Sequence, residues 1–254
     1  MVLSKNKKYQ YLFFSILCVY TIFNGGNSNI LIQLNFILIS LLFLYCLKDK
    51  NYILHFKIFY LKNRISIFFY TLFLFYLVFQ IIPLPIEYLK LFSPFKYDHI
   101  SELSTNIQYS SISLSPSNSF FQILNFISLL ILVFILKMIF YTNKHKNRLF
   151  FFLTFIGAFA SCVAVYFYLI GNPDFWIIKN INKSAATGFF ISRAVFSCFL
   201  TMCFFSGIEY LKMIDRYRKN DADVFFNKIY IRIFLLFITI GIITSFSKIG
   251  NFLF

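Results

Sequence analysis

Seven mostly apolar stretches alternate with polar breaks along the chain. An α-helix needs about 20 consecutive, mostly apolar residues to cross the hydrocarbon core of a bilayer. On that criterion the candidate spans are Tyr9–Asn24, Ile30–Leu47, Ile65–Ile82, Phe120–Tyr141, Leu149–Ile170, Thr187–Ile208 and Ile229–Ser245. The pattern predicts an all-α fold: a polytopic membrane helix bundle of about seven transmembrane helices, ending at the start of an eighth. The first span is short, so the lysines before it must snorkel to the membrane surface.

The basic residues sort onto one side of these predicted spans. When successive breaks are assigned to alternate sides, most of the 24 Lys and Arg residues share the side of the N terminus. The far side keeps only Lys90, Lys96, Lys179, Lys183, Arg193 and Lys248. The positive-inside rule therefore predicts a cytoplasmic N terminus and a C terminus across the membrane.

The composition is typical of a membrane protein and excludes an ordinary soluble domain. The chain is 59% hydrophobic, with 39 Phe and 17 Tyr, and only 13% of its residues are charged, against about 25% in an ordinary soluble domain. The net charge of +15 comes largely from the cytoplasmic breaks, so it is a topology signal and no nucleic-acid partner is expected. The expected partner is the lipid bilayer.

The longest break is the predicted extracytoplasmic loop at about 83–119. A Pro-Leu-Pro run ends the span before it, and residues 87–92 predict a short interfacial helix. Ser and Asn residues at the end of the loop are good caps for the next helix.

The cytoplasmic breaks at 141–148 and 210–228 are short and basic, and they predict solvated turns. No repeat, heptad pattern or low-complexity linker divides the chain. We therefore expect a single transmembrane domain over residues 1–254, and an incomplete one.

The sequence carries none of the common catalytic or metal-binding motifs. It has no phosphate-binding glycine loop, no His/Cys metal spacing and no acidic residue deep within a predicted span. The five cysteines lie in apolar stretches without a C-x-x-C pair, which predicts buried, inert thiols. His55, His99 and His145 fall in polar connections, which favours solvated side chains. We predict no metal and no cofactor, and the catalytic residues are unknown.

Arg193 is the residue whose position most demands a functional reason. A helix that begins near Ala186 places it about two turns inside an apolar span, where an isolated charge costs about 2.5–3.5 kcal/mol. Gly188 permits close approach of backbone or ligand, and Ser192 precedes the arginine. A guanidinium beside a helix N terminus favours an anion such as a diphosphate. Lys248, beyond the seventh span, is a candidate second phosphate contact. For both cations the alternative is an interfacial side chain that snorkels outward.

Five segments resemble, in order, the O-antigen ligase and polymerase superfamily. The most specific one, Ala-Thr-Gly-Phe-Phe-Ile-Ser-Arg-Ala-Val-Phe, is similar to that family's Ala-Thr-Gly-x-Phe-x-Asn-Arg-Asn-x-Phe signature. The last, Thr-Ser-Phe-Ser-Lys-Ile-Gly, is similar to its Thr-x-Ser-Arg-x-Gly segment. The five segments are Phe79–Pro94, Ile112–Pro116, Arg148–Gly171, Ala186–Phe196 and Thr244–Gly250. The resemblance runs from about residue 65 to the C terminus.

This resemblance implies a metal-independent membrane glycosyltransferase of the bacterial inner membrane. Such an enzyme moves a glycan from a polyprenyl diphosphate carrier to lipid A core or another acceptor on the periplasmic face. In that family, arginines at the periplasmic mouth hold the diphosphate, and a base in a large later periplasmic loop activates the acceptor. The implied diphosphate-binding residues here are Arg193 and Lys248, supported by Gly188 and Ser192. The implied partners are the polyprenyl diphosphate-linked glycan and, as a candidate, a separate chain with the remaining helices.

The chain also departs from the family pattern. Ser192 and Ala194 stand where the signature has asparagine, and Lys248 is a point charge where the family has a forked guanidinium. The large periplasmic loop with the catalytic histidine is not found, so we expect the N-terminal portion of such a protein. Whether it is an enzyme, and ligase or polymerase, stays open. The alternatives are a noncatalytic truncated membrane protein and a transport-associated member of the superfamily.

Overall fold

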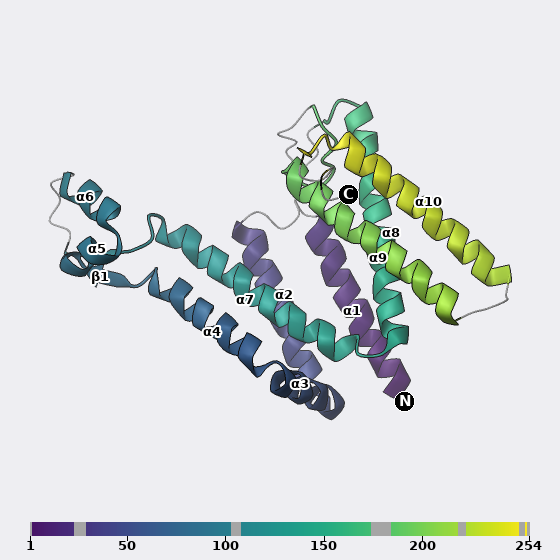
Figure 1. Cartoon of the computed structure of the whole chain (residues 1–254), viewed down its shortest axis with the longest axis horizontal. Coiled ribbons are helices and arrows are strands. Elements are labelled where there is room, and N and C mark those ends of the chain that lie inside the picture. The colour runs from purple at the N-terminus through teal and green to yellow at the C-terminus, as the bar shows by residue number, and fades with distance from the viewer. Residues whose placement is uncertain are drawn as a thin grey trace. The chain divides into compact units, whose positions relative to one another are not determined.

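The computed structural model describes residues 2–22, 29–102, 108–173, 184–217, 222–248 and 252 (Figure 1). These residues form ten helices and one two-stranded sheet. In chain order the elements are α1 (Val2–Ile22), α2 (Asn29–Leu47), α3 (Lys50–Lys62), α4 (Arg64–Phe79), β1 (Pro83–Pro85), α5 (Ile86–Phe92), α6 (Pro94–Glu102), β2 (Tyr109–Ser111), α7 (Pro116–Ile139), α8 (Asn143–Leu169), α9 (Arg193–Tyr217) and α10 (Ala222–Thr244). The predicted helical fold is confirmed, with a small sheet added.

Five helices in the described part of the chain are long and apolar enough to cross a membrane. They are α2, α7, α8 and the stretches Arg193–Ile214 of α9 and Phe225–Thr244 of α10. Helices α3 and α4 pass the same test only as a pair, bent by 86°, which raises the count to six. The chain is a multi-pass membrane protein. The predicted count of about seven includes α1, which is not among these helices, so that count and the orientation of the N terminus stay predictions.

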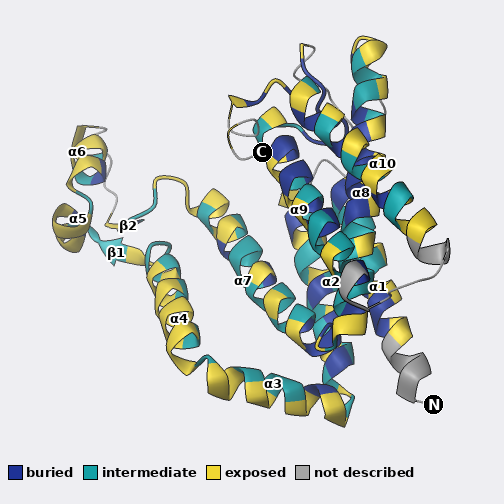
Figure 2. Ribbon diagram, turned by 45° about the vertical axis from the view of Figure 1, so that its right-hand side comes forward, coloured by how far each residue is buried: buried dark blue, intermediate teal, exposed yellow. Residues whose placement is uncertain are grey.

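The chain forms two compact units, one of residues 1–31 with 139–254 and one of residues 32–138. In the first unit α8, α9 and α10 pack on one another, and Figure 2 shows buried residues concentrated along them. In the second unit α4 has no buried residue at all. That exposure fits an apolar helix whose surroundings are lipid. The single domain predicted for residues 1–254 stays a prediction.

Two glycines bring the helices of the first unit close together. A Cβ on Gly157 of α8 would overlap the side chain of Cys203 on α9, and one on Gly241 of α10 would overlap Ser161 of α8. The hydroxyl of Ser161 also donates a 2.5 Å hydrogen bond to the carbonyl of Phe237 on α10. Lipid tails are as apolar as the helices, so close packing and interhelical hydrogen bonds must hold membrane helices together. These small residues supply both.

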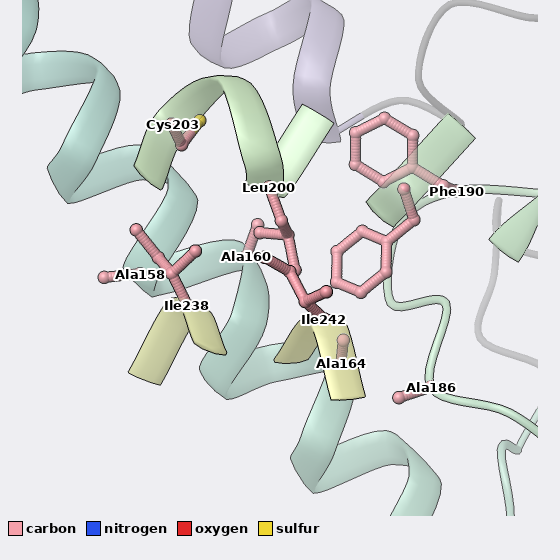
Figure 3. Packing of buried hydrophobic residues seen from close by; sticks show 10 residues of the cluster. Ala158, Ala160, Ala164, Ala186, Phe190, Leu200, Cys203, Ile238 and Ile242 are labelled. Atoms are coloured by element: carbon pink, nitrogen blue, oxygen red, sulfur yellow. The ribbon is translucent and has the colours of Figure 1, made fainter. Parts of the chain in front are cut away.

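A cluster of buried apolar side chains completes the core of the first unit (Figure 3). It draws on α8, α9, α10 and the non-helical segment 184–192 that precedes α9. Its members are Ala158, Ala160, Ala164, Ala186, Phe190, Phe196, Leu200, Cys203, Ile238 and Ile242. The segment 184–192 is thus built into the core and is not a surface loop.

Helix α1 joins the first unit at the start of α8. The ring of Phe14 stacks on that of Phe152 with centroids 4.2 Å apart. Nearby, Nε2 of Gln10 lies 2.6 Å from Nδ1 of His145. The guanidinium of Arg148 donates a 3.0 Å hydrogen bond to Oε1 of the same Gln10. Gln10 is 2% exposed, so this is a satisfied polar network inside the unit.

The predicted turn at 141–148 is wrong from Asn143 on, where α8 begins, although Lys144 is exposed; the predicted solvation of His145 is wrong. Thr142 caps α8, and its side chain accepts a hydrogen bond from the backbone N–H of His145. Gln10, far away in the sequence, pairs with the side chains of His145 and Arg148, so these polar residues are satisfied in the first turns of α8. The second predicted turn, 210–228, is also wrong over most of its length, because α9 and α10 extend into it; residues 218–221 lie outside the described residues.

The second unit connects α4 to α7 through a compact folded segment. Helix α5 confirms the short helix predicted at 87–92, whereas α6 and the antiparallel pair β1 and β2 were not predicted. The ammonium of Lys96 on α6 donates to the carbonyls of Ser111 and Ser113, each at 2.5 Å. Its burial lowers the pKa of Lys96. Helix α7 begins within the predicted cap run, at Pro116, because proline suits the first helical position.

We predict that enlarging Gly157 loosens the packing of α8 on α9. Gly157→Leu forces a side chain into the space of Cys203, and overpacking of this kind costs roughly 1–3 kcal/mol. Cys162→Leu is the matched control, because Cys162 is exposed on the same helix. Unfolding of the full chain in mixed micelles should show a lower unfolding free energy for Gly157→Leu alone. Equal stability of the two variants would contradict this packing.

Candidate functional site

The helix that carries Arg193 begins later than the sequence predicted. Helix α9 starts at Arg193 itself, and the carbonyl of Ser192 accepts its first backbone hydrogen bond, from Phe196 at 3.0 Å. Before it, the N–H of Phe190 bonds to the carbonyl of Thr187 in a turn. The prediction that Arg193 lies two turns inside a helix is therefore wrong. Its side chain is exposed at the helix N terminus, and the cost of a charge at mid-span does not apply.

Gly188 prevents a helix that begins at Ala186 from continuing into α9. Its φ of +56° lies in the left-handed region, which glycine enters without a steric penalty. A Cβ at this position would lie 2.9 Å from Cβ and 3.2 Å from Cα of Ala164 on α8. The predicted close approach is confirmed, and the group that approaches is the backbone of α8.

Two hydrogen bonds hold the segment 184–192 in the core. The N–H of Ala186 donates to the carbonyl of Thr244, the last residue of α10, at 3.1 Å. The side-chain amide of Asn172 donates to the carbonyl of Ala185 at 3.0 Å. Asn172 is 1% exposed and both alanines are fully buried. The segment is thus tied to the chain that follows α8 and to the end of α10.

Lys248 follows the same end of α10. The chain leaves the helix through Ser245, whose N–H bonds to the carbonyl of Gly241, and through Phe246 with a φ of +48°. Ser245 and Ser247 are buried, whereas the side chain of Lys248 is exposed. Both segments singled out in the sequence therefore meet by way of the Ala186–Thr244 bond, and each contains an exposed cation.

The local electrostatics favour an anion at this end of the unit. The first turn of α9 contains no acidic residue, and the unpaired N–H groups of a helix N terminus act as about half a positive charge. Arg193 adds a guanidinium at the same place. The arrangement can hold a phosphate-type anion. It offers no general base among the residues singled out from the sequence.

Asn172 is a structural residue of this site that sequence reasoning missed. It adopts a φ of +52° directly after Gly171 at +89°. A Gly-Asn pair after an apolar run is a known helix-ending signal, because asparagine tolerates the left-handed region. The Gly-Asn pair can be read from the sequence, but the hydrogen bond from the side-chain amide of Asn172 to the carbonyl of Ala185 cannot.

The other candidate groups belong to other elements of the chain. His99 is exposed on α6 and His55 lies in α3, both in the second unit. In the described part of the chain no group of three or more His, Cys, Asp and Glu residues is placed to hold a metal ion. The predicted burial of the thiols is confirmed for Cys46 and Cys203 and wrong for Cys162 and Cys198, which are exposed on apolar helices; Cys18 is half-buried.

Comparisons with known proteins leave the chain without an assigned relative. No protein-family model, no curated protein and no solved structure matches it. The resemblance of the motif segments to the O-antigen ligase superfamily therefore stays a prediction.

We predict that Gly188→Ala lowers the unfolding free energy more than Gly171→Ala does. Both glycines have positive φ, which costs a residue with a side chain about 1–2 kcal/mol. Only at Gly188 does the new methyl meet α8, at Ala164, which adds roughly 1–3 kcal/mol. The unfolding free energy of each variant measures the difference, and Ala164→Gly should partly rescue Gly188→Ala. Equal losses at the two glycines, or no rescue, would contradict the close contact.

Proposed function

We propose that this chain is an O-antigen ligase-like or polymerase-like membrane protein of the bacterial inner membrane. In this proposal it forms part of a glycosyltransferase that moves a glycan from a polyprenyl diphosphate carrier to lipid A core or another acceptor on the periplasmic face. Support comes from the multi-pass helical architecture, which gives a lipid-linked substrate access from the bilayer, and from the ordered motif segments.

The contact between Ala186 and Thr244 carries the proposal. It joins two segments that lie far apart in the sequence and that were both singled out from it, the Ala-Thr-Gly segment and the Thr-Ser-Phe-Ser-Lys segment. A diphosphate has two phosphoryl groups and needs more than one cationic contact. The two segments meet and carry Arg193 and Lys248, so they are suited to supply these cationic contacts.

The roles of the two cations follow from their shapes. Arg193 presents a planar fork that matches two phosphate oxygens at once, next to the N terminus of α9. Lys248 is a compact point charge that contributes attraction with little directional demand. Gly188 and Ser192 support the site by turning the chain and by starting the helix. The base that activates the acceptor is not assigned.

The proposed topology follows the sorting of basic residues. With about seven spans and a cytoplasmic N terminus, the start of α9 and the end of α10 both lie on the periplasmic face. Helix α1 then counts as the first span, with its early lysines snorkelling to the cytoplasmic surface.

We predict that Arg193→Ala weakens binding of a polyprenyl diphosphate to the full chain. Loss of a charge-assisted, bidentate contact should raise Kd about 10- to 100-fold. The Kd of Arg193→Lys should fall between those of the unmodified chain and Arg193→Ala. Lys248→Ala should raise Kd less than Arg193→Ala does. Binding of a fluorescent polyprenyl diphosphate to protein in nanodiscs measures these values.

The matched control is Arg232→Ala, which removes an exposed arginine from α10 in the same unit. It should leave Kd unchanged. When Arg193 is replaced, the affinity for a polyprenyl monophosphate should fall less than the affinity for the diphosphate. Equal affinity of Arg193→Ala and Arg232→Ala for the diphosphate would contradict the proposed site. It would favour the noncatalytic or transport-associated alternatives.

A further inference from the structure

Helix α3 carries side chains that fit neither water nor the middle of a bilayer. Large apolar residues are 43–58% exposed along this helix of 13 residues: Ile53, Leu54, Ile58, Tyr60 and Leu61. Three lysines are exposed on it as well: Lys50, Lys57 and Lys62. Burying each charge at mid-bilayer would cost about 2.5–3.5 kcal/mol, and leaving the apolar side chains in water forfeits their burial. Only the boundary between headgroups and acyl chains accommodates both.

The bend at Asn63 keeps α3 out of the span. A helix of 13 residues is about 20 Å long, and α3 turns from α4 by 86°. It therefore advances only about 1 Å along the axis of α4, so it adds almost nothing to a crossing. If α4 runs across the bilayer, α3 lies nearly flat in the membrane plane.

The contacts of α3 place it at the ends of the neighbouring spans. Phe56 and Phe59 pack edge-on against Phe134, with ring centroids 5.2 and 5.7 Å apart. Phe134 lies in the last two turns of α7, and the ammonium of Lys137 in its final turn lies 6.0 Å from the centroid of Phe59. A lysine in the last turn of a span marks the level of the membrane surface. Helix α3 thus lies at that level.

The charge around α3 is predominantly positive. From residue 48 to residue 64 the chain carries five exposed cations, namely Lys48, Lys50, Lys57, Lys62 and Arg64, against the single carboxylate of Asp49. That carboxylate caps α3 by accepting a hydrogen bond from the N–H of Asn51. A flat helix with this charge, at the membrane surface, complements anionic headgroups.

We propose that α3 is an interfacial helix that binds anionic phospholipids through Lys50, Lys57 and Lys62, while its exposed apolar residues rest on the upper acyl chains. On this proposal α4 is the only helix of the bent pair that enters the hydrocarbon core, and α3 anchors its cytoplasmic end. The proposal stands on the second unit alone and is independent of the glycan-transfer proposal.

Photo-crosslinking to lipid from one position on α3 tests it. Benzoylphenylalanine introduced in place of Ile58 is irradiated in the full chain, reconstituted in nanodiscs of phosphatidylethanolamine and phosphatidylglycerol at 3:1. Mass spectrometry identifies the headgroup of each lipid adduct and the acyl carbon that was attacked. We expect abundant adducts on the upper half of the acyl chain. Among these adducts, phosphatidylglycerol should be enriched about fivefold over its share of the bulk lipid.

Two triple variants separate specific from general attraction. Lys50→Gln, Lys57→Gln and Lys62→Gln together should remove the enrichment at position 58 while keeping the adducts. Lys7→Gln, Lys8→Gln and Lys144→Gln, an equal charge change at exposed lysines of the first unit, should leave it intact.

Three results would overturn the proposal. Absence of lipid adducts would place the face of Ile58 in water or against protein. Adducts at the terminal methyl would make α3 a re-entrant segment. A headgroup ratio equal to the bulk, or equal effects of the two triple variants, would leave α3 without preference for anionic lipid.

Discussion

The first unit is organised by the need of its non-helical backbone for hydrogen-bond partners. Among membrane helices an unpaired peptide group costs several kcal/mol, so backbone that leaves helical geometry must be paired within the protein. The segment 184–192 meets this need through the end of α10, at Thr244, and through Asn172 after α8. Those two bonds hold in place the segment that leads into α9 and to Arg193.

Close helix packing makes such pairing possible. Gly157 and Gly241 allow α8 to approach α9 and α10, and Gly188 lets the segment lie directly on Ala164. A larger residue at any of these sites would push apart the elements whose ends form the candidate site. The same small residues that stabilise the bundle therefore also set the geometry of the proposed diphosphate contacts, which links the stability of the first unit to its proposed function.

The sequence predicted the apolar helices well because a run of apolar residues is a local property. Helix ends and the burial of polar side chains were harder to predict. The start of α8 has a local signal in its cap Thr142, but the burial of His145 depends on Gln10, 135 residues away, and no local pattern contains that pairing. Counting apolar residues also placed the start of α9 too early, because it ignores the left-handed φ of Gly188. Arg193, Lys248, Gly188 and Ser192 were singled out from sequence, but only the structure joins their two segments.

Photoaffinity mapping of the bound carrier tests the central claim most directly. A polyprenyl diphosphate analogue with a diazirine next to the phosphates is irradiated with the full chain in nanodiscs, and the modified peptides are sequenced. The account predicts adducts in both the 184–193 and the 244–248 segments, removed by excess unlabelled carrier. Adducts confined to one of these segments, or found only elsewhere, would contradict a diphosphate site built where the two segments meet.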